Sequence, residues 1–381
     1  MDFNFSEEQA MVIAGAKEFA REKIAPVAEK YDEKQEVNLD ALRELGRLGY
    51  MGMTVPEEYG GTGLGAVAYV GAMIEFSKAD SGVSVAVSVQ NSLVNDAIMM
   101  FGTDEQKKTF LPKLSSGEWL GCFSLTEAGA GSDPGSLRAS AVRDGDDFVL
   151  NGTKNFTTNG SFADVIIAFF QTDKDKGAKG ISAFLIMKDT PGFAVGKHEN
   201  KLGIRSSSTT EMVFTDCRIP ASAMLGKENK GLSIALATLD CGRLGIAAQA
   251  VGIAEAALDE SVKYAKERVQ FGQKLGEFQA IQFMLADMAT EVEVAKTMLY
   301  RVAAMKDGGA KRFTKESAMI KLFSAEMSHR VCHKALQIHG GYGFMKDYKV
   351  ERLYRDQRIT EIYEGTSEIQ RVVISRAVLG D

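Results

Sequence analysis

The sequence predicts a mainly α-helical protein with a β-domain in its middle, divided into residues 1–118, 119–225 and 226–381. Three observations support this division. The first segment has helix-capping signals, the second has short apolar runs between Gly, Pro and charged turns, and the third has two long apolar stripes at helical spacing. The length of 381 residues points the same way, because a chain of this size is expected to form roughly two to three domains.

Helix-capping signals define the first segment. Ser6 with Gln9, and Thr103 with Gln106, have the spacing of a capping box, in which two side chains bond to free backbone amides at a helix N-terminus. We therefore expect one helix to begin just after Ser6 and another just after Thr103. Residues 81–90 are small and β-branched, and we expect this stretch to be buried against another element.

Strand and turn signals define the middle segment. An apolar run leads into Asn151-Gly152, a dipeptide typical of two-residue turns, so a hairpin is predicted at that point. Residues 165–171, 181–188 and 211–214 are further predicted strands, separated by Gly, Pro and charged residues. No long helical pattern lies between them, which favours a small β-domain over alternating β–α–β units.

Two apolar stripes with helical spacing define the last segment. Their steps of three and four residues are typical of a seam between packed antiparallel helices, within one subunit or between two. We interpret both stripes as helix core. They consist of Ala247, Val251, Ala254, Leu258 and Val262, and of Ile281, Leu285, Met288, Val292, Ala295, Leu299 and Val302.

Composition excludes several classes of protein. The 45 basic and 51 acidic residues give a net charge of −6, which argues against nucleic acid as the main partner. Four cysteines without a Cys-x-x-Cys pair exclude a disulfide scaffold and an iron–sulfur ligand set. No apolar run reaches the ~18 residues of a spanning helix, and the acidic start is unlike a signal or transit peptide. We therefore expect no membrane insertion, and either a bacterial cytoplasmic location or a mitochondrial matrix protein whose presequence has been removed.

Familiar enzyme motifs are scarce in this chain. It has no metalloprotease, nucleophile-elbow or kinase motif. His329 and His333 stand four residues apart on a predicted helix, a spacing that can ligate a metal, and His339 follows them. No nearby set of acidic residues completes such a site. We interpret all three as ordinary core or surface histidines and predict no metal.

Three stretches carry residue types suited to a bound heterocycle or to phosphates. Residues 122–133 form a predicted strand that ends in glycines, hydroxyls and acids, and residues 156–160 place an aromatic ring beside hydroxyls. Residues 337–343 interrupt a helical block with glycines. Each stretch also has a purely structural interpretation, as a tight turn, an ordinary strand pair or a helix break, and composition alone does not choose between them.

Glu364 is the candidate for a catalytic carboxylate. Ser367 and Gln370 have capping-box spacing, which places Glu364 just before a helix N-terminus. A carboxylate there either complements the helix dipole or is held beside a ligand at an anion-friendly helix end. Glu361 and Glu368 compete for the same role, and spacing does not separate the three.

Together these stretches resemble the acyl-CoA dehydrogenase family over essentially the whole chain, and most of all its short-chain (butyryl-CoA) branch. Each motif is modest alone, but the order and spacing make the set specific. The motifs are LTEAGAGSD at 125–133, NGTKNFTTNG at 151–160, KLGIRSS at 201–207, ERVQFG at 267–272, QIHGGYG at 337–343 and YRD…IYEGTSEIQ at 354–370.

The resemblance implies a helical N-terminal domain, a middle β-domain built as a small barrel or sandwich, and a C-terminal four-helix bundle, assembled as a homotetramer (a dimer of dimers). It implies FAD held at a subunit interface. The flavin-ring contacts carry over to Leu125, Thr126, Phe156, Thr157, Thr158, Thr366 and Glu368, and Ser132 falls where flavin and CoA groups meet. Positions that hold the ADP half of a neighbouring subunit's FAD match Arg268, Phe271, Gln279, Gln337, Gly340 and Gly341.

The resemblance also assigns the chemistry. Glu364 matches the base of the short- and medium-chain enzymes, which takes the α-proton of an acyl thioester while the β-hydride goes to flavin N5, giving a trans-2-enoyl-CoA. The Glu364 backbone amide and a ribityl hydroxyl are the implied donors to the thioester carbonyl. Long- and branched-chain relatives carry their base at a position that is Gly242 here, which has no side chain to act. The residues assigned to the substrate are Ser132, Asp240, Arg243, Tyr363 and Gly365.

The electron acceptor and the acyl group are less closely defined. The sequence offers no second redox centre and no nicotinamide fingerprint, so by resemblance electrons are expected to pass to an electron-transfer flavoprotein. An oxygen-using flavin oxidase of the same fold and a catalytically silent scaffold are the alternatives. Ser84 stands where glutaryl-CoA dehydrogenases have an arginine, which disfavours a dicarboxylic substrate. Asp96 departs from the apolar pattern of its helix and is either exposed or a polar feature for a cyclic or unsaturated acyl group.

Overall fold

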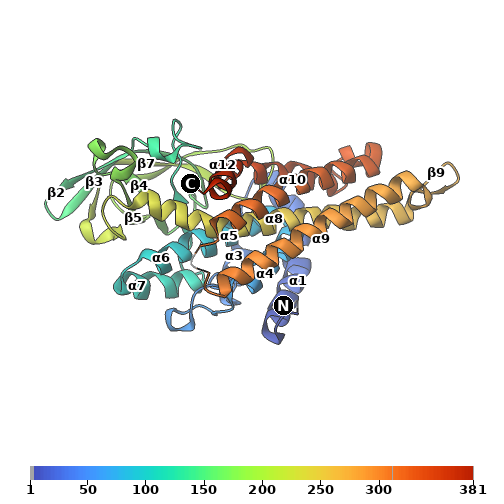
Figure 1. Cartoon of the computed structure of the whole chain (residues 1–381), viewed down its shortest axis with the longest axis horizontal. Coiled ribbons are helices and arrows are strands. Elements are labelled where there is room, and N and C mark those ends of the chain that lie inside the picture. The colour runs from blue at the N-terminus through green and yellow to red at the C-terminus, as the bar shows by residue number, and fades with distance from the viewer. Residues whose placement is uncertain (1–3, 311, 381) are drawn as a thin grey trace.

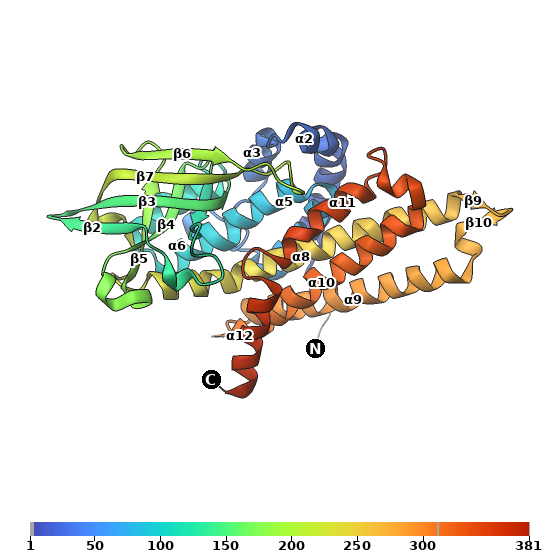
Figure 2. The same ribbon diagram turned by 90° about the horizontal axis from the view of Figure 1, so that it is seen from above.

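Along the chain, one helical region precedes a β-domain and another follows it, as the sequence predicts (Figure 1). This computed structural model describes residues 4–310 and 312–380, so the first three residues of the acidic N-terminal stretch lie outside the described part. The β-domain lies at one end of an elongated molecule, and the longest helices run from it to the other end (Figure 2).

Helices build the N-terminal region. Both predicted capping boxes are present, with Ser6 and Thr103 as N-caps. The prediction that residues 81–90 are buried is also confirmed. The α-helices are α1 (Glu7–Phe19), α2 (Ala28–Lys34), α3 (Leu39–Arg47), α4 (Gly65–Ala79), α5 (Ser81–Ser88), α6 (Asp96–Phe101) and α7 (Asp104–Ser115), with π-helical turns at Ala20–Ile24 and Val89–Asn95.

One sheet forms the middle domain, and it folds over on itself. Its order is β6-β7-β3-β2-β4-β5-β8, and β1 pairs in parallel with β4. Phe148 contacts Phe184 across β3 and β5, and Phe170 contacts Phe214 across β4 and β7, although neither pair of strands is hydrogen-bonded. These contacts enclose an apolar core, as in a sandwich. The strands are β1 (Gly121–Ser124), β2 (Ser140–Asp144), β3 (Asp147–Thr158), β4 (Val165–Gln171), β5 (Ile181–Met187), β6 (Phe193–His198), β7 (Thr209–Pro220) and β8 (Met224–Leu225).

The hairpin turn predicted at Asn151-Gly152 is wrong. Strand β3 continues through both residues, and the turn lies instead at Gly145, between β2 and β3. The register between β3 and β7 shifts between Leu150 and Gly152, where Gly152 has a φ of +139°. The Asn151 side chain accepts a hydrogen bond from the Asp216 amide on β7. The dipeptide therefore marks a bulge in a long strand, because its glycine tolerates the irregular backbone there.

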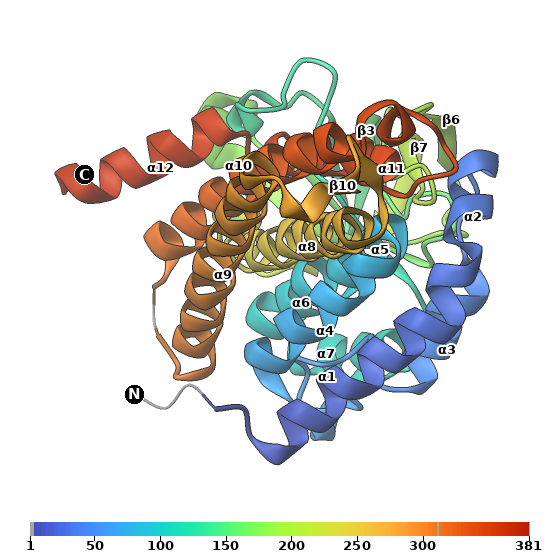
Figure 3. The same cartoon turned by 90° about the vertical axis from the view of Figure 1, so that its right-hand side faces the viewer.

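The C-terminal region is a bundle around α8. Figure 3 shows α8 enclosed by α4, α5, α9 and α10, and the two helical regions share one apolar core. Five members of the predicted stripe on α9 are core, since Met288, Val292, Ala295, Leu299 and Val302 are buried, while Ile281 and Leu285 are half-buried and pack against that core. The elements are α8 (Gly231–Glu267), β9 (Val269–Gln270), β10 (Gln273–Lys274), α9 (Gln279–Asp307), α10 (Thr314–His339), α11 (Val350–Gln357) and α12 (Ser367–Leu379).

Helix α8 is the one helix in the described part of the chain that is long and apolar enough to cross a membrane. Two-thirds of its most apolar window (67%) is buried inside the protein. A core helix passes the same test of length and composition, and the packing of α8 against α4, α9 and α10 gives its apolar side chains protein neighbours. We therefore interpret α8 as the central core helix.

Candidate active site

Glu364 lies in a short loop with an unusual backbone. The loop joins the 3-10 turn Arg358–Glu361 to α12. Glu364 has a φ of +51° and Gly365 a φ of +94°, so two consecutive residues are in the left-handed region. This region is costly for glutamate, and such residues gather at functional sites when the surrounding structure holds them.

The capping signal after this loop is displaced by one residue from the prediction. Thr366, not Ser367, is the N-cap of α12, and its hydroxyl accepts from the backbone three residues on. Gln370 does not complete a capping box. Its side-chain amide turns back and donates to the carbonyls of Glu364 and Gly365, at 3.1 and 2.9 Å. The glutamine therefore fixes the loop instead of the helix end.

The carboxylate of Glu364 is enclosed against α8. A Cβ added at Gly242 would overlap with Oε2 of Glu364, so this glycine provides the space that the carboxylate occupies. Oε2 is buried and has no hydrogen-bond partner within residues 4–310 and 312–380. Burial raises the pKa of Glu364 to about 7, although the cations of Lys321 and Arg243 lower it. A carboxylate with a pKa near neutrality is suited to accept and release a proton.

Arg243 and Asp240 form a buried pair on α8 near this carboxylate. Nη1 of Arg243 lies 2.6 Å from Oδ1 of Asp240, and the Thr314 hydroxyl donates to the other carboxylate oxygen at 2.5 Å. Tyr363, beside the base, donates its hydroxyl to the side-chain oxygen of Gln249 on the same helix. The structure therefore gathers Asp240, Arg243 and Tyr363 around α8, and their assignment to the substrate stays a prediction.

Lys321 is a residue of this site that the sequence argument missed. It is fully buried on α10, and Nζ donates to the Gly365 carbonyl at 2.7 Å. Burial lowers the pKa of Lys321 to about 7, although Glu364 raises it. The available signal was a lysine between Ile320 and Leu322 in an otherwise apolar stretch of helix. A buried lysine needs a partner, and the pattern does not reveal that the partner is a loop more than forty residues away.

A second group of predicted residues meets where β1 and β3 end. The Asn155 amide donates to the Thr126 carbonyl at 2.8 Å, and the hydroxyls of Ser124 and Thr157 lie 2.7 Å apart. Phe156 has a φ of +56° and its side chain is 62% exposed, so that an aromatic ring is available at this edge. We call this surface the platform; it consists of Leu125, Thr126, Phe156, Thr157 and Thr158, with the exposed Ser132 further along the loop.

A buried ion pair fixes the platform loop. Lys154 on β3 is fully buried, and its Nζ lies 2.8 Å from Oε1 of Glu127. The same carboxylate accepts hydrogen bonds from the amides of Arg138 and Ala139. Burial lowers the pKa of Lys154 to about 8, while Glu127 raises it. This pair joins the two sides of the loop to β3, and sequence reasoning did not single it out.

A third group surrounds a cavity of about 440 Å³ at the far end of the bundle. Arg268, Gly340 and Gly341 line it, while Phe271 is almost fully exposed on the β9–β10 turn nearby. The guanidinium of Arg268 lies over the ring of Tyr342. Gln279 begins α9 and Gln337 lies in the last turn of α10, but neither lines the cavity. Figure 2 places β9 and β10 at the opposite end of the molecule from the sheet.

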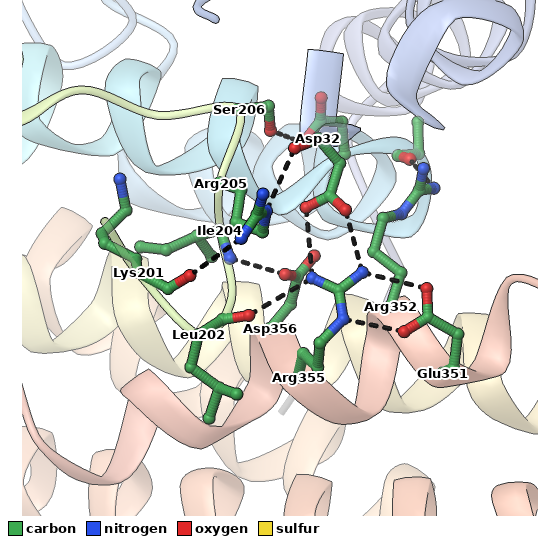
Figure 4. A network of polar contacts seen from close by, with 12 residues as sticks. Asp32, Lys201, Leu202, Ile204, Arg205, Ser206, Glu351, Arg352, Arg355 and Asp356 are labelled. Carbon is green, nitrogen blue, oxygen red and sulfur yellow. Dashed lines mark hydrogen bonds and ion pairs between the residues drawn. The ribbon is translucent and has the colours of Figure 1, made fainter. Parts of the chain in front are cut away.

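The KLGIRSS motif at 201–207 joins the three regions instead of lining a pocket. The Ile204 amide donates to Asp356 on α11 at 2.5 Å, and Arg355 pairs with Asp32 of α2 at 2.8 Å (Figure 4). We call this network, drawn in Figure 4, the latch; it consists of Asp32, Lys201, Leu202, Ile204, Arg205, Ser206, Glu351, Arg352, Arg355 and Asp356. It connects the N-terminal region, the end of the β-domain and the segment that leads to Glu364.

The two predictions about acyl specificity have different outcomes. Asp96 is buried, so the interpretation that it is exposed is wrong. Its carboxylate pairs with Lys306 of α9 at 2.5 Å and accepts from the Thr54 hydroxyl at 2.9 Å. Ser84 is fully buried, and its hydroxyl donates to the Ser81 carbonyl. Its assignment against a dicarboxylic substrate stays a prediction.

A carboxylate with a buried, unpartnered oxygen, an edge with an exposed aromatic ring and a separate cavity beside an arginine are, in the described part of the chain, together compatible with a flavin-dependent oxidoreductase. Family models of the acyl-CoA dehydrogenase N-terminal, middle and C-terminal domains match residues 6–118, 122–217 and 229–379. The chain belongs to the acyl-CoA dehydrogenase family, whose members are FAD-dependent oxidoreductases that act on the CH–CH bond of acyl-CoA. The resemblance recognised from the motifs is therefore confirmed.

Individual relatives match over nearly the full length. Butyryl-CoA dehydrogenase from Megasphaera elsdenii is 45% identical, with a TM-score of 0.98 and full coverage of both chains. A chain from the structure of the electron transferring flavoprotein of Acidaminococcus fermentans is 46% identical, with the same TM-score and coverage. Acryloyl-CoA reductase (NADH) from Anaerotignum propionicum is 47% identical over 381 residues, which cover 100% of this chain and 96% of the relative.

Two features of the structure fit FAD. At the cavity, a Cβ added to Gly340 or Gly341 would meet no atom within 4 Å, so the backbone there is open to a phosphate beside the Arg268 guanidinium. At the platform, the ring of Phe156 is exposed and Thr126 and Thr158 are half-buried, so that an aromatic ring and hydroxyl-bearing residues reach the same edge, which suits a flat heterocycle with polar edges. The hydroxyl of Thr157 is buried and bonded to Ser124 instead. The residues present therefore match the cofactor that the family uses.

Proposed function

We propose that this chain converts a short-chain acyl-CoA to the trans-2-enoyl-CoA, with Glu364 as the base. The observation that carries the assignment of the base is the enclosed carboxylate of Glu364, whose Oε2 lacks a partner in the described part of the chain. Glu361 also has a buried oxygen without a hydrogen-bond partner in the described residues, but its other oxygen pairs with Arg358, whereas Glu364 forms no such pair there. Glu368 is exposed. The similarity to a butyryl-CoA dehydrogenase supports a short acyl chain.

The reaction follows from the properties of this carboxylate. The α-proton of a thioester is weakly acidic, and a base whose pKa is close to the working pH removes it efficiently. Glu364 takes that proton, the electron pair of the broken C–H bond forms the Cα=Cβ double bond, and the β-carbon releases a hydride. FAD, when bound, accepts this hydride. We assign the Glu364 backbone amide to the thioester carbonyl, where it stabilises developing negative charge.

The remaining assignments extend the proposal to the cofactor and substrate. The platform residues, with Thr366 and Glu368, would hold the flavin ring, and the residues of the far cavity would hold the ADP half of a neighbouring subunit's FAD in a homotetramer. Support comes from the position of the far cavity, which is lined by Arg268 and Gln270 beside the β9–β10 turn, at the end of the molecule opposite the sheet (Figure 2). Arg243 and Asp240 are assigned to the CoA moiety together with Ser132.

We propose an electron-transfer flavoprotein as the electron acceptor and the bacterial cytoplasm as the location. The similarity to a chain in the structure of an electron transferring flavoprotein supports the acceptor. The relative named acryloyl-CoA reductase points to the reverse reaction, in which Glu364 returns a proton to the α-carbon. Both directions use the same base, and the direction of net flux depends on the acceptor.

The experiment that tests the base is Glu364→Gln. Glutamine keeps the size and polarity of the side chain but cannot accept a proton. We expect the variant to bind FAD and to lose anaerobic bleaching of the flavin by butyryl-CoA by about 10³-fold, within the range that a general base contributes. Stopped-flow absorbance measures the rate. Normal bleaching by the variant would refute the assignment of Glu364.

A substrate panel tests the acyl group and the acceptor. We expect linear short-chain acyl-CoA to bleach the flavin faster than branched, cyclic or dicarboxylic thioesters. Faster bleaching by a cyclic or dicarboxylic thioester would contradict the short-chain proposal. Steady production of hydrogen peroxide without an added acceptor would identify an oxidase instead of a dehydrogenase.

A further inference from the structure

Lys321 is a fully buried lysine beside the loop that carries the proposed base. We infer that Lys321 is a positioning residue for Glu364, which holds the loop through the Gly365 carbonyl and keeps an unpaired positive charge near the carboxylate. The inference rests on the proposed role of Glu364. It assigns a function to a residue outside the set of cofactor and substrate contacts.

The first argument is the single partner of Lys321. Burying an ammonium group costs several kcal/mol unless it is paired or hydrogen-bonded. In residues 4–310 and 312–380, Lys321 forms no ion pair within 4 Å, and its side-chain hydrogen bond goes to the Gly365 carbonyl at 2.7 Å. Its neighbours on α10 are core residues such as Ile320 and Ser324. A purely structural helix position would be filled at lower cost by an apolar residue.

The second argument is the backbone of the loop. Glu364 and Gly365 both have positive φ, and this conformation persists only if other groups hold it. The Gly365 carbonyl accepts from two donors, the ammonium of Lys321 and the side-chain amide of Gln370. One donor is cationic and the other is neutral. Lys321 and Gln370 therefore both hold the Gly365 carbonyl in place, but of these two only Lys321 carries a charge.

The third argument is the arrangement of charges around the carboxylate. Lys321 from α10 and Arg243 from α8 are the cations that lower the pKa of Glu364 against the effect of burial. The charge of Arg243 is already paired with Asp240. Lys321 also faces Glu361, before the loop, and Glu368 on α12, which are paired or exposed. The hydroxyls of Tyr69 and Tyr363 complete the titratable groups near Glu364.

The test uses four holoenzyme variants and the pH dependence of anaerobic flavin bleaching by butyryl-CoA. Lys321→Met removes the charge and the donor but keeps the length of the side chain. Lys321→Arg keeps both charge and donors. Gln370→Leu removes the neutral donor to the same carbonyl and to the carbonyl of Glu364, and leaves the charge of Lys321 in place. Lys349→Met is the matched control, since Lys349 also donates from a largely enclosed position to a carbonyl, that of Lys78, away from the active site.

We expect Lys321→Met to move the acid limb of the rate profile to higher pH by about one unit, because loss of a nearby cation disfavours the ionised base. On that limb, a shift of one unit slows bleaching about tenfold. Lys321→Arg should restore the wild-type limb. Gln370→Leu should slow bleaching at every pH without moving the limb, and Lys349→Met should leave the profile unchanged.

The outcomes separate this inference from the proposed function. An unshifted limb in Lys321→Met, with wild-type bleaching intact and Glu364→Gln inactive, would overturn the role of Lys321 and leave the base assignment standing. If the wild-type flavin is not bleached by any acyl-CoA, the proposed function fails and the inference fails with it. If Lys321→Met loses FAD, Lys321→Gln replaces it, and an unshifted limb in that variant overturns the inference in the same way.

Discussion

Two buried carboxylates close together in the sequence, Glu364 and Asp356, have almost the same acidity and different surroundings. Burial raises the pKa of each to about 7. Asp356 accepts a hydrogen bond from the Ile204 amide and lies inside the latch (Figure 4). Oε2 of Glu364 has no partner in the part of the chain that the structure describes. A raised pKa alone therefore does not identify a base, and the decisive difference is the unoccupied oxygen.

The cations near the two carboxylates also differ in the groups that they bind. In the latch, Arg355 pairs with Asp32 and Glu351, so the charges hold the N-terminal region against α11. Near the base, Lys321 binds a backbone carbonyl and leaves the carboxylate free. Changes in the latch should therefore reduce stability and spare the reaction rate. Changes in the base loop should reduce the rate and spare stability.

The largest effect in this comparison is expected from Gly242→Ala. The added methyl group would overlap with Oε2 of Glu364 and displace the carboxylate. A displacement of about 1 Å can cost about 100-fold in rate, which corresponds to about 2.7 kcal/mol of activation free energy. Stopped-flow bleaching measures the rate. The melting temperature should change little, because alanine favours the helix more than glycine while the added methyl group also meets Cδ2 of the buried Leu93 at 2.8 Å. A variant with the wild-type rate would show that the carboxylate does not depend on this space.

A smaller effect, on stability, is expected from Arg355→Met. This change leaves Asp32 without its cation, and since the pair keeps some contact with solvent we expect a loss of about 2 kcal/mol in the free energy of unfolding. Denaturant titration measures it. The control is Arg218→Met, which removes two exposed ion pairs, to Asp144 and Asp147, and should cost less than about 1 kcal/mol. An equal loss in both variants, or a large loss of bleaching rate in Arg355→Met, would contradict the assigned role of the latch.

The smallest effect is expected from Asp356→Asn, and it depends on pH. An acid whose pKa is raised by folding keeps its proton in the native state at pH values where the unfolded chain has released it. The native state then binds more protons, so this group makes the protein less stable as pH rises from about 4 to about 7. Asparagine does not titrate. Between about pH 5 and about pH 6 the free energy of unfolding should therefore shift in favour of the variant by about 1 kcal/mol.

The measurement for Asp356→Asn is denaturant unfolding of both proteins at each pH, so that the contribution of Glu364 cancels in the difference. A difference that is constant with pH would mean that Asp356 is ionised throughout, held by Arg352, which lowers its pKa. In that case Asp356 and Glu364 would differ in pKa as well as in their hydrogen bonding. In either case the bleaching rate should stay close to that of the wild type.

The sequence predicts the order of the domains and the long elements well, because these depend on local periodicity and capping. The predictions from the sequence are wrong where the same residues are compatible with two different local structures. Asn151-Gly152 is typical of a turn, but in β3 the glycine serves a bulge, since the neighbouring strand β7 continues past it. Gln370 has capping-box spacing, but its side chain is taken by the carbonyls of the base loop. In both cases contacts with distant parts of the chain determine the role of the residue, and such contacts cannot be inferred from the spacing of residues in the sequence.

The site could be predicted from motifs only as a set of separate positions. The sequence singles out Glu364 because it precedes a helix, but the enclosure of its carboxylate depends on Gly242 and on the buried Lys321, which come from two other helices. Asp96 shows the same limit. Its polar character is evident in the sequence, whereas its partner Lys306 is 210 residues away. Charges that pair across such separations leave no local pattern.

Helix α8 has a consequence for how one molecule of cofactor is shared. Gly242 lies about three turns into the helix, and Arg268 follows directly after its C-terminal end. About 25 residues of continuous helix separate them, a span of about 38 Å at 1.5 Å per residue. The proposed assignments place the base beside Gly242 and the ADP half of a neighbouring subunit's FAD beside Arg268, and this rigid spacer keeps the two apart. Under the proposed assignments each polypeptide would hold complementary halves of two different sites, and a mixture of chains damaged at opposite ends of this spacer should recover sites that neither parent can complete alone.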